Sequence, residues 1–405
     1  MIQKNYSITN TIQKKHFDKQ KIKKISKKYK KHFDEIQNEI KSKNTLHVLN
    51  NDFRFNFKIS ELNKFKKFKT IAVIGMGGSI LGLEAIYNFL EKKIKKKIYF
   101  FDDIEEQKIL NFKKEIHISN TLFIIISKSG NTIETLSNSF SLNILKKNAK
   151  NVIIISEKQN NTLYSISKKL NLFYIEHKNF IGGRYSVLSE VGILPAYLMG
   201  INTKKLRSRI LESLKGKQKN FLKESTIKLA GILNSKKYNN IVFLNYSSKL
   251  GKFLLWCQQL MAESLGKNNK GFMPIISNVP KDHHSLLQLY LDGPKDKLFY
   301  IFSYEEKSKK KIKSVKLNKN SNDILNNKSL SDIKIAQQNA LIKAFKIKNI
   351  PFREFQIKKG EEEVIGELFA YFMFETILIG KLVAINPFNQ PAVEQVKIFT
   401  NKYLN

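Results

Sequence analysis

Short apolar runs alternate with longer segments of helical periodicity through most of the first half of the chain. Strands that alternate with helices fold into a parallel sheet covered on both faces, because each helix carries the chain back to the start of the next strand. The sequence therefore predicts a doubly wound sheet. Its predicted strands are residues 70–75, 97–103, 121–127, 151–156 and 172–176.

A second cycle of the same kind follows. A predicted strand at 239–248 precedes a helix over 249–267, and another strand follows at 297–303. Residues 12–43 place apolar side chains three or four apart, which predicts an amphipathic helix with a lysine-rich outer face. Residues 304–332, rich in Lys, Asn and Ser, are predicted to form a solvated excursion. We therefore predict an α/β protein with two doubly wound parallel sheets and additional N- and C-terminal helices.

The composition limits the partners that such a protein would have. The 405 residues exceed one ordinary core, so two domains are expected. The formal net charge is +38, yet only five of the 72 basic residues are arginine. Nucleic-acid readers favour arginine forks and interleaved aromatic residues, so we expect no nucleic-acid partner and attribute the lysines to an AT-rich coding bias. The charge would still attract small anionic substrates.

Three further features concern the compartment. The single cysteine, Cys257, excludes a disulfide framework and suits a reducing cytoplasm. The N-terminus is rich in lysine but lacks the apolar core of a signal peptide. The most apolar stretch, residues 366–385, contains Glu367, Glu375 and Lys381, and a core helix explains it better than a membrane span. We therefore expect a cytoplasmic protein that does not enter a membrane.

Two predicted strands end in loops that suit a phosphate group. Residues 75–79 read GMGGS and residues 127–132 read SKSGNT, so Lys128 stands among hydroxyl groups. Both loops follow strands of one parallel sheet and should meet at its carboxyl edge, where ligands bind. The first loop resembles a dinucleotide fingerprint but has Ile80 where the third glycine is required. No P-loop motif occurs, so a phosphate monoester fits best.

Each loop also has a purely structural interpretation. The first could be a tight turn without a ligand. In the second, Asn131 and Glu134 have the spacing of a helix capping box. Capping, however, does not require three hydroxyl groups and a lysine before the helix begins. We therefore predict that the second loop clamps a phosphate group.

Five segments match the motifs of one family. In these segments, and in their order, the chain resembles the glucose-6-phosphate isomerases, which have two sugar-isomerase (SIS) domains, and more closely their shorter bacterial branch. The segments are IGMGGSILG (74–82), SKSGNTIET (127–135), GGRYSVLSEVGILP (182–195), QQLMAESLGK (258–267) and NPFNQPAVEQVK (386–397).

The resemblance implies SIS-type, flavodoxin-like domains and a division of the chain into four parts. These are an N-terminal helical segment (1–50), a first SIS domain with the phosphate clamp (51–200), a second SIS domain with the catalytic Glu and His (201–385), and a C-terminal segment and helix with the catalytic lysine (386–405).

The same resemblance implies the site residues. Glu263 would be the catalytic base, Arg184 would stabilise the reacting oxygens, and His284, assisted by Lys397, would open the sugar ring. His283 is the other candidate for the ring-opening histidine, although the HSLLQL frame favours His284. The residues expected to bind substrate or its phosphate are Ser79, Ser127, Lys128, Ser129, Thr132, Gly78, Gly183, Gln259 and Gln390.

The implied reaction is the interconversion of glucose 6-phosphate and fructose 6-phosphate through ring opening and a cis-enediol(ate), in glycolysis and gluconeogenesis. The alternatives are an isomerase that also accepts mannose 6-phosphate and a non-catalytic SIS sugar-phosphate sensor, although a sensor should lack Glu263, Arg184 and Lys397 together. No cofactor and no metal are expected. The resemblance also implies a homodimer whose active site is completed across the interface.

Overall fold

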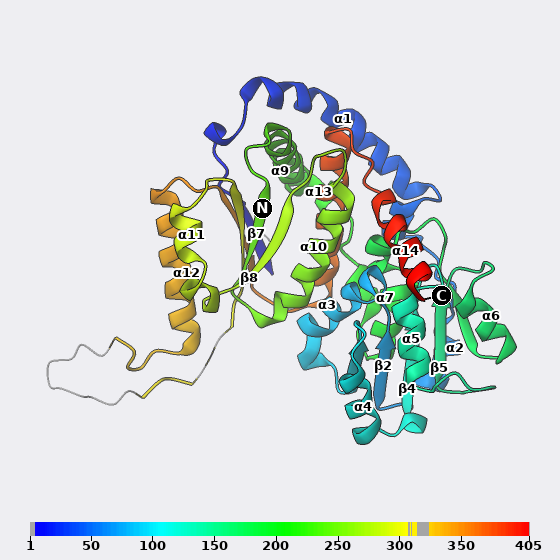
Figure 1. Cartoon of the computed structure of the whole chain (residues 1–405). Coiled ribbons are helices and arrows are strands. Elements are labelled where there is room, and N and C mark those ends of the chain that lie inside the picture. The colour runs from blue at the N-terminus through cyan, green and yellow to red at the C-terminus, as the bar shows by residue number, and fades with distance from the viewer. Residues whose placement is uncertain (1–4, 307, 309, 314–323, 405) are drawn as a thin grey trace.

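The computed structural model describes residues 5–306, 308, 310–313 and 324–404. Two lobes lie side by side in Figure 1, each built around a β-sheet, and α1 arches over the top of the view. The strands are β1 (Tyr6–Asn10), β2 (Thr70–Ile74), β3 (Lys97–Phe101), β4 (Thr121–Ile126), β5 (Val152–Ser156), β6 (Phe173–Glu176), β7 (Asn240–Asn245), β8 (Met273–Asn278), β9 (Lys297–Tyr304) and β10 (Phe352–Ile357). The helices are α1 (Lys19–Lys41), α2 (Ile59–Leu62), α3 (Leu81–Leu90), α4 (Glu106–Glu115), α5 (Ile133–Ser141), α6 (Thr162–Lys169), α7 (Glu190–Leu198), α8 (Thr203–Arg207), α9 (Gly216–Ser235), α10 (Gly251–Leu265), α11 (Leu287–Asp292), α12 (Leu330–Ile347), α13 (Glu362–Leu382) and α14 (Glu394–Leu404). The short 3-10 turns that matter below are η4 (Gly77–Ser79), η5 (Glu91–Lys93), η7 (Gly183–Leu188), η10 (Lys281–His284) and η11 (Pro391–Val393).

The first sheet confirms the doubly wound prediction. Its order is β3-β2-β4-β5-β6, all pairs are parallel, and each of its five strands was predicted from the sequence. The chain goes from β2 to one side of the sheet and then returns to the other side at β4. The crevice between the ends of these two strands is where a doubly wound sheet binds its ligand.

The second sheet repeats this topology and adds an edge strand. Its order is β8-β7-β9-β10-β1, and the first four strands are parallel. The fifth, β1, pairs antiparallel with β10, with Tyr6 opposite Ile357. The prediction of an N-terminal helical segment over 1–50 does not hold for residues 6–10, because a partner about 350 positions away decides their conformation and no local pattern reports it.

Three apolar cores follow from the alternation of side chains along the strands. In β2, Ile71 and Val73 face a central core, whereas Ala72 and Ile74 face an outer one beside α4. The central core lies between the two sheets and contains helices α3, α7, α9, α10 and α13. A second outer core packs α12 against the far face of the second sheet. The two lobes thus share one continuous apolar interior.

Two sequence predictions about exposed and apolar segments can be compared with this fold. The apolar stretch 366–385 falls almost entirely within α13, whose side chains are nearly all buried in the central core. None of the helices in the described part of the chain is long and apolar enough to cross a membrane. The predicted excursion 304–332 lies partly outside the described residues, and most of its described members between β9 and α12 are exposed.

A buried ion pair joins β10 to α13 inside the central core. Arg353, fully buried, donates to both carboxylate oxygens of Glu375 at 3.0 and 2.9 Å and to the hydroxyl of Tyr371 at 2.7 Å. Tyr371 and Ser225 also donate to Glu375, and the guanidinium lies 4.7 Å from the ring centre of Tyr300. The carboxylate is thus satisfied by three partners. Removing one member would leave charge uncompensated in an apolar core.

We predict that Arg353→Met lowers the free energy of unfolding by about 3–5 kcal/mol, because Glu375 is then buried without its cation. Replacing both residues, in Arg353→Met/Glu375→Met, should recover more than half of that loss, since a pair of apolar side chains suits the core. Urea unfolding of the three proteins measures the difference. A double variant less stable than the single one would contradict this account.

Candidate active site

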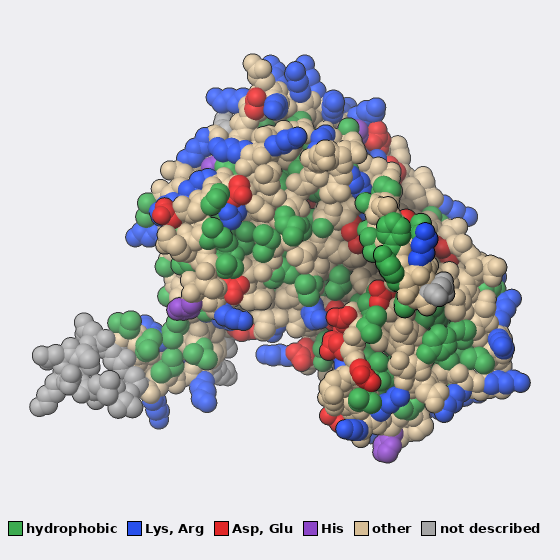
Figure 2. Space-filling model, in the orientation of Figure 1, with side chains coloured by type: hydrophobic (Ala, Val, Ile, Leu, Met, Phe, Trp, Pro, Cys, Tyr) green, Lys and Arg blue, Asp and Glu red, His purple; other side chains and the backbone are tan. Residues whose placement is uncertain are grey.

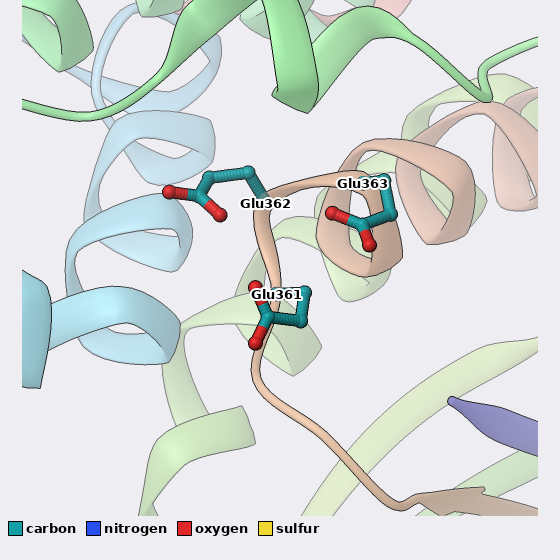
Figure 3. Close-up of side chains that lie close together, drawn as sticks. All are labelled: Glu361, Glu362 and Glu363. Atoms are coloured by element: carbon teal, nitrogen blue, oxygen red, sulfur yellow. The ribbon is translucent and has the colours of Figure 1, made fainter. Parts of the chain in front are cut away.

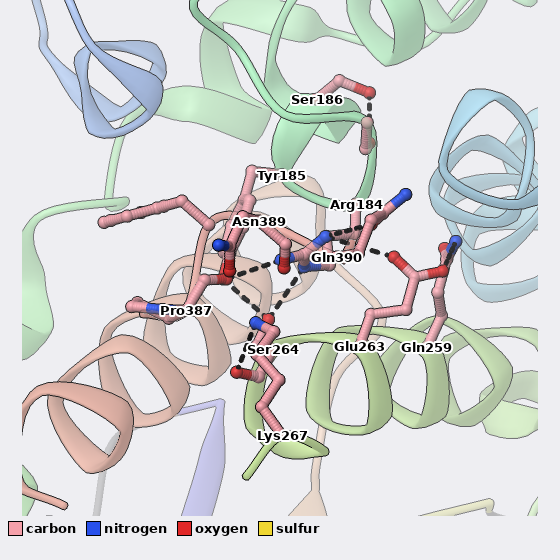
Figure 4. Close-up of polar contacts among 12 residues, drawn as sticks. Arg184, Tyr185, Ser186, Gln259, Glu263, Ser264, Lys267, Pro387, Asn389 and Gln390 are labelled. Carbon is pink, nitrogen blue, oxygen red and sulfur yellow. Dashed lines mark hydrogen bonds and ion pairs between the residues drawn. The ribbon is translucent and has the colours of Figure 1, made fainter. Parts of the chain in front are cut away.

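The guanidinium of Arg184 is the hub of a polar cluster at the junction of the two lobes. Arg184 is the second residue of η7 and is 3% exposed. Its guanidinium carbon lies 5.2 Å from the ring centre of Tyr185. Figure 4 shows the partners converging on it from α10 and from the segment before η11. Its N–H groups donate to Ser264 Oγ (2.8 Å), Glu263 Oε2 (3.2 Å), Gln390 Oε1, the carbonyl oxygen of Pro387 (2.6 Å) and that of Asn389 (3.2 Å).

Glu263 is held at both carboxylate oxygens. It lies in the last turn of α10, and Gln259, one turn earlier on the same face, donates to its Oε1 at 2.9 Å while Arg184 donates to its Oε2. The Glu263 side chain remains 29% exposed. Gln259 in turn lies against the first glycine loop, since a Cβ on Gly77 would come within 2.8 Å of its Nε2. The sequence prediction brought these residues to one face, and the structure places them in contact.

The glycine loop and the arginine loop touch through their backbones. A Cβ on Gly78 would lie 2.3 Å from the carbonyl carbon of Gly183 and 2.6 Å from the backbone nitrogen of Arg184. The hydroxyl of Ser186 donates to the carbonyl oxygen of Gly78 at 3.2 Å and so ties η7 to η4. A side chain cannot fit between the two loops, which explains the glycine at 78.

The second polar loop is shaped by its own hydroxyl groups. Ser127 Oγ and Thr132 Oγ1 lie 2.8 Å apart, and the backbone N–H of Gly130 donates to Ser127 Oγ at 3.1 Å. The capping-box interpretation is wrong: α5 begins after Thr132, whose hydroxyl caps nothing, and Asn131 instead accepts from the N–H of Thr162. The hydroxyl groups are therefore not used to cap the helix.

The first glycine loop lies next to this second loop. A Cβ on Gly75, at the end of β2, would be 3.0 Å from the carbonyl oxygen of Ile126 and 3.2 Å from Cβ of Ser79. Ile126 is the last residue of β4 and directly precedes Ser127. Ser79 and Ser127 therefore belong to one edge of the first sheet, as predicted.

The lysine of the second loop has an unexpected partner. Lys128 Nζ lies 3.5 Å from Oε1 of Glu157, a residue of the loop after β5. No sequence motif pointed to Glu157, which is one acidic residue in a lysine-rich stretch. The exposed Ser129 accepts from the N–H of Asn131 at 3.3 Å.

The structure does not bring the predicted histidine to Glu263 within one chain. His284 ends η10, and the preceding His283 is 3.1 Å from the hydroxyl of Tyr246, which directly follows β7. Helix α10 begins near that same edge, at Gly251. Glu263 lies twelve residues further along the helix, so the two Cα positions are about 18 Å apart at 1.5 Å per residue. His284 is exposed, whereas burial lowers the pKa of the half-buried His283.

Lys397 also stands apart from the cluster. It lies on α14, which has no buried residue, and its ammonium group pairs with Glu394 at 2.7 Å. Figure 2 shows apolar side chains gathered over this helix. Of the exposed apolar residues of α14, Val396, Phe399 and Tyr403 are 66%, 46% and 90% exposed, and their spacing puts them along one side of the helix.

Three residues of the cluster were not singled out from the sequence. Tyr185 shares a 2.8 Å contact with Ser264 and donates to the Pro387 carbonyl. Lys267 donates to the carbonyl oxygens of Ser264 and Asn386, at 3.1 and 2.6 Å. Burial, together with the charge of Arg184, lowers the pKa of Lys267 to about 8, while Glu263 opposes the shift. Ser264 and Lys267 lie inside the segment QQLMAESLGK, close to Glu263 in the sequence. This proximity is the sequence feature from which both residues could have been predicted.

One acidic group among the described residues has the proximity that a metal ion needs. Figure 3 shows the carboxylates of Glu361, Glu362 and Glu363 at the start of α13, within 4.8 Å of one another. Lys93 of η5 lies 2.7 Å from Glu362, and Lys205 of α8 lies 2.6 Å from Glu361. Hydrogen bonds from these lysines lower the pKa of Glu361. The two ammonium groups balance two of the three carboxylate charges and pair with all three glutamates, so we treat the cluster as a structural bridge.

Comparison with known proteins relates this geometry to a family. The family model described as phosphoglucose isomerase matches residues 37–278. The chain is 34% identical to a probable glucose-6-phosphate isomerase of Methanococcus maripaludis over 387 residues, covering 89% of this chain and 83% of the relative. It is 31% identical to the glucose-6-phosphate isomerase of Campylobacter jejuni, covering 83% and 86%.

Solved structures share the fold at lower sequence identity. A glucose-6-phosphate isomerase from Chlamydia trachomatis superposes with a TM-score of 0.77 at 17% identity, covering all of this chain and 89% of that one. A hypothetical protein from Thermus thermophilus superposes with a TM-score of 0.76 at 22% identity, covering 98% and 100%. At these identities the likeness concerns the fold alone.

We predict that Gly78→Ala lowers the melting temperature and weakens binding of inorganic phosphate, because its Cβ would push η4 away from η7 at a cost of about 1–3 kcal/mol or more. The matched control is Gly183→Ala, where a Cβ meets nothing within 4 Å, so its melting temperature should stay near that of the wild type. Thermal unfolding and calorimetry measure both effects. Equal stability of the two variants would mean that the loops can separate freely.

Proposed function

The chain belongs to the phosphoglucose isomerase family, and on that premise we propose how its side chains carry the reaction. It is an aldose–ketose isomerase that interconverts D-glucose 6-phosphate and D-fructose 6-phosphate. The observation that carries the residue assignment is the contact of Glu263 with both Arg184 and Gln259 at the edge of the glycine loop. This arrangement supplies a partly exposed carboxylate beside a fixed cation.

The phosphate group of the sugar would anchor at the carboxyl edge of the first sheet. The hydroxyl groups of Ser79, Ser127, Ser129 and Thr132 are donors, and Lys128 supplies a compact cation. What supports this proposal is that the Ser127 and Thr132 hydroxyl groups face each other at 2.8 Å and neither caps a helix. Gly78 keeps the adjacent loops in contact, and the space beside Gly183 would leave room for the sugar next to Arg184 and Glu263.

Glu263 would move the proton between the two carbons. In the open-chain aldose it removes the C2 proton, the C1 carbonyl takes up the electron pair as an enediolate oxygen, and a proton passes between the two oxygens. Glu263 then returns its proton to C1, which leaves the carbonyl at C2. Arg184, fixed by five acceptors, is preorganised to stabilise the oxyanion, and Gln259 and Gln390 hold the groups around it.

Ring opening would use His284 of a second subunit, assisted by Lys397. No described contact joins His284 to Glu263 within one chain, and α14 leaves apolar side chains uncovered. A homodimer that brings His284 to the neighbour's Glu263 would complete the site and cover that surface. Two identical subunits related by a twofold axis form two such sites. We propose the cytoplasm as the compartment, since its reducing conditions suit a chain with one cysteine.

The first prediction isolates the base. In deuterated water with EDTA, wild-type protein should interconvert the two sugar phosphates and introduce solvent deuterium at the transferred position. Glu263→Gln keeps the shape but accepts no proton, so turnover and exchange should fall together by about 10²–10⁴-fold. Interconversion of the sugar anomers, which rests on other residues, should persist. NMR follows turnover, deuterium exchange and anomer interconversion in one tube. If deuterium enters the sugar at the wild-type rate in Glu263→Gln, Glu263 is not the base.

The second prediction tests the shared site. Glu263→Gln and His284→Gln, each almost inactive alone, should recover activity when coexpressed. A mixed dimer has one site with both residues intact and one with both replaced, so random pairing gives about a quarter of the wild-type rate. Coexpression of Glu263→Gln with Arg184→Gln is the control, since both residues come from the same chain and should not complement. If the test pair does not recover activity, the histidine of the neighbouring subunit does not complete the site. Recovery in the control would mean that complementation does not report a site shared between subunits.

A further inference from the structure

Lys128, the lysine of the proposed clamp, has a carboxylate partner. Among the described ion pairs of Lys128 there is one carboxylate, Glu157, at 3.5 Å, and Glu157 has no other cationic partner within 4 Å there. The Glu157 side chain is 11% exposed and that of Lys128 is 34% exposed. Because water reaches this pair poorly, the attraction is screened less than in an exposed pair.

The backbone holds Glu157 in this place. Its N–H donates to the carbonyl oxygen of Lys128 at 3.0 Å, so the two residues continue the pairing of β4 with β5 beyond the sheet. Asn161 donates to the carbonyl oxygen of Glu157 at 2.8 Å and packs so closely on Gly130 that a Cβ there would meet it at 1.8 Å. The loop after β5 thus buttresses the phosphate loop along its length.

None of the other described charged groups forms an ion pair with Glu157 or Lys128. Gln159 donates to the second carboxylate oxygen of Glu157. His177 is buried, and burial lowers its pKa to about 4, so it is neutral at physiological pH. Lys178 is paired with Glu190 at 2.8 Å. A phosphate dianion that enters the clamp therefore meets a lysine whose charge is already shared with a fixed carboxylate.

We propose that Glu157 is a positioning residue that competes with the substrate phosphate for Lys128. In the empty site it holds the lysine at the edge of the clamp. When a sugar phosphate binds, the lysine turns from the carboxylate to the phosphate oxygens, while Glu157 stays in place on Gln159 and the backbone. This competition weakens substrate and product alike and so speeds their release. The proposal rests on the proposed phosphate clamp at Ser127–Thr132.

The test is Glu157→Gln, which keeps the shape and removes the charge. KM for fructose 6-phosphate, measured by a coupled assay, and the inhibition constant of inorganic phosphate should both fall, by roughly three- to tenfold. Tighter binding is a gain that mere damage to the loop would not produce. Glu176→Gln is the matched control, because Glu176 pairs with Ser156 at the end of the next strand and has no ion pair with Lys128. It should change neither constant by more than about twofold.

The variant Lys128→Gln separates the two proposals. If the clamp is correct, it raises KM and the inhibition constant of phosphate by about tenfold or more. In the Lys128→Gln protein, the fall in KM and in the inhibition constant of phosphate caused by Glu157→Gln should be smaller by at least about threefold, because no lysine remains to be released. An unchanged phosphate constant in Lys128→Gln would overturn the clamp itself. With the clamp intact, the competition is overturned if Glu157→Gln weakens binding, matches Glu176→Gln, or gives the same gain in both backgrounds.

Discussion

The arrangement of the site depends on one guanidinium group. Arg184 donates to side chains of α10 and to backbone carbonyls of residues 387 and 389, so it joins three segments that are far apart in the sequence. Its planar fork can satisfy several acceptors at once, which a lysine cannot do. Since Glu263 takes its position from the same group, the proposed catalytic carboxylate and the C-terminal segment are fixed together. The close backbone contact at Gly78 then joins the loop of Arg184 to the first glycine loop, next to the proposed phosphate clamp.

The use of arginine elsewhere follows the same logic. The chain has 67 lysines and five arginines, and lysine covers solvated faces such as the outer side of α1. Arg353 is fully buried with Glu375, and Arg207 donates to the carbonyls of Val48, Leu188 and Asn50. Arg209 pairs with the buried Glu367 at 3.0 Å. At four of its five positions arginine thus meets acceptors that are buried or belong to the backbone, whereas the fifth, Arg54, is exposed.

The sequence predicted much of the fold, and the failures have physical causes. Seven strands were predicted because buried parallel strands are continuous apolar runs. Strand β10 was missed because Arg353 and Glu354 interrupt its apolar pattern, and β8 because Pro274 is its second residue. At the site, Arg184 and Glu263 were predicted from the motifs and lie in contact. Glu157 was missed, because its role comes from strand pairing across β4 and β5 and not from a local pattern.

The edge strand β1 has a consequence for synthesis. Residues 6–10 are synthesised before their partner, residues 352–357, which is made about 350 residues later. At about 5–20 residues per second the segment waits roughly 20 to 70 s for its hydrogen-bonding partner. A long apolar strand left unpaired for that time would invite aggregation. The actual segment, YSITN, has five residues of which three are polar, and a lysine-rich helix follows it. Strand β1 is thus suited to stay unpaired until β10 has been made.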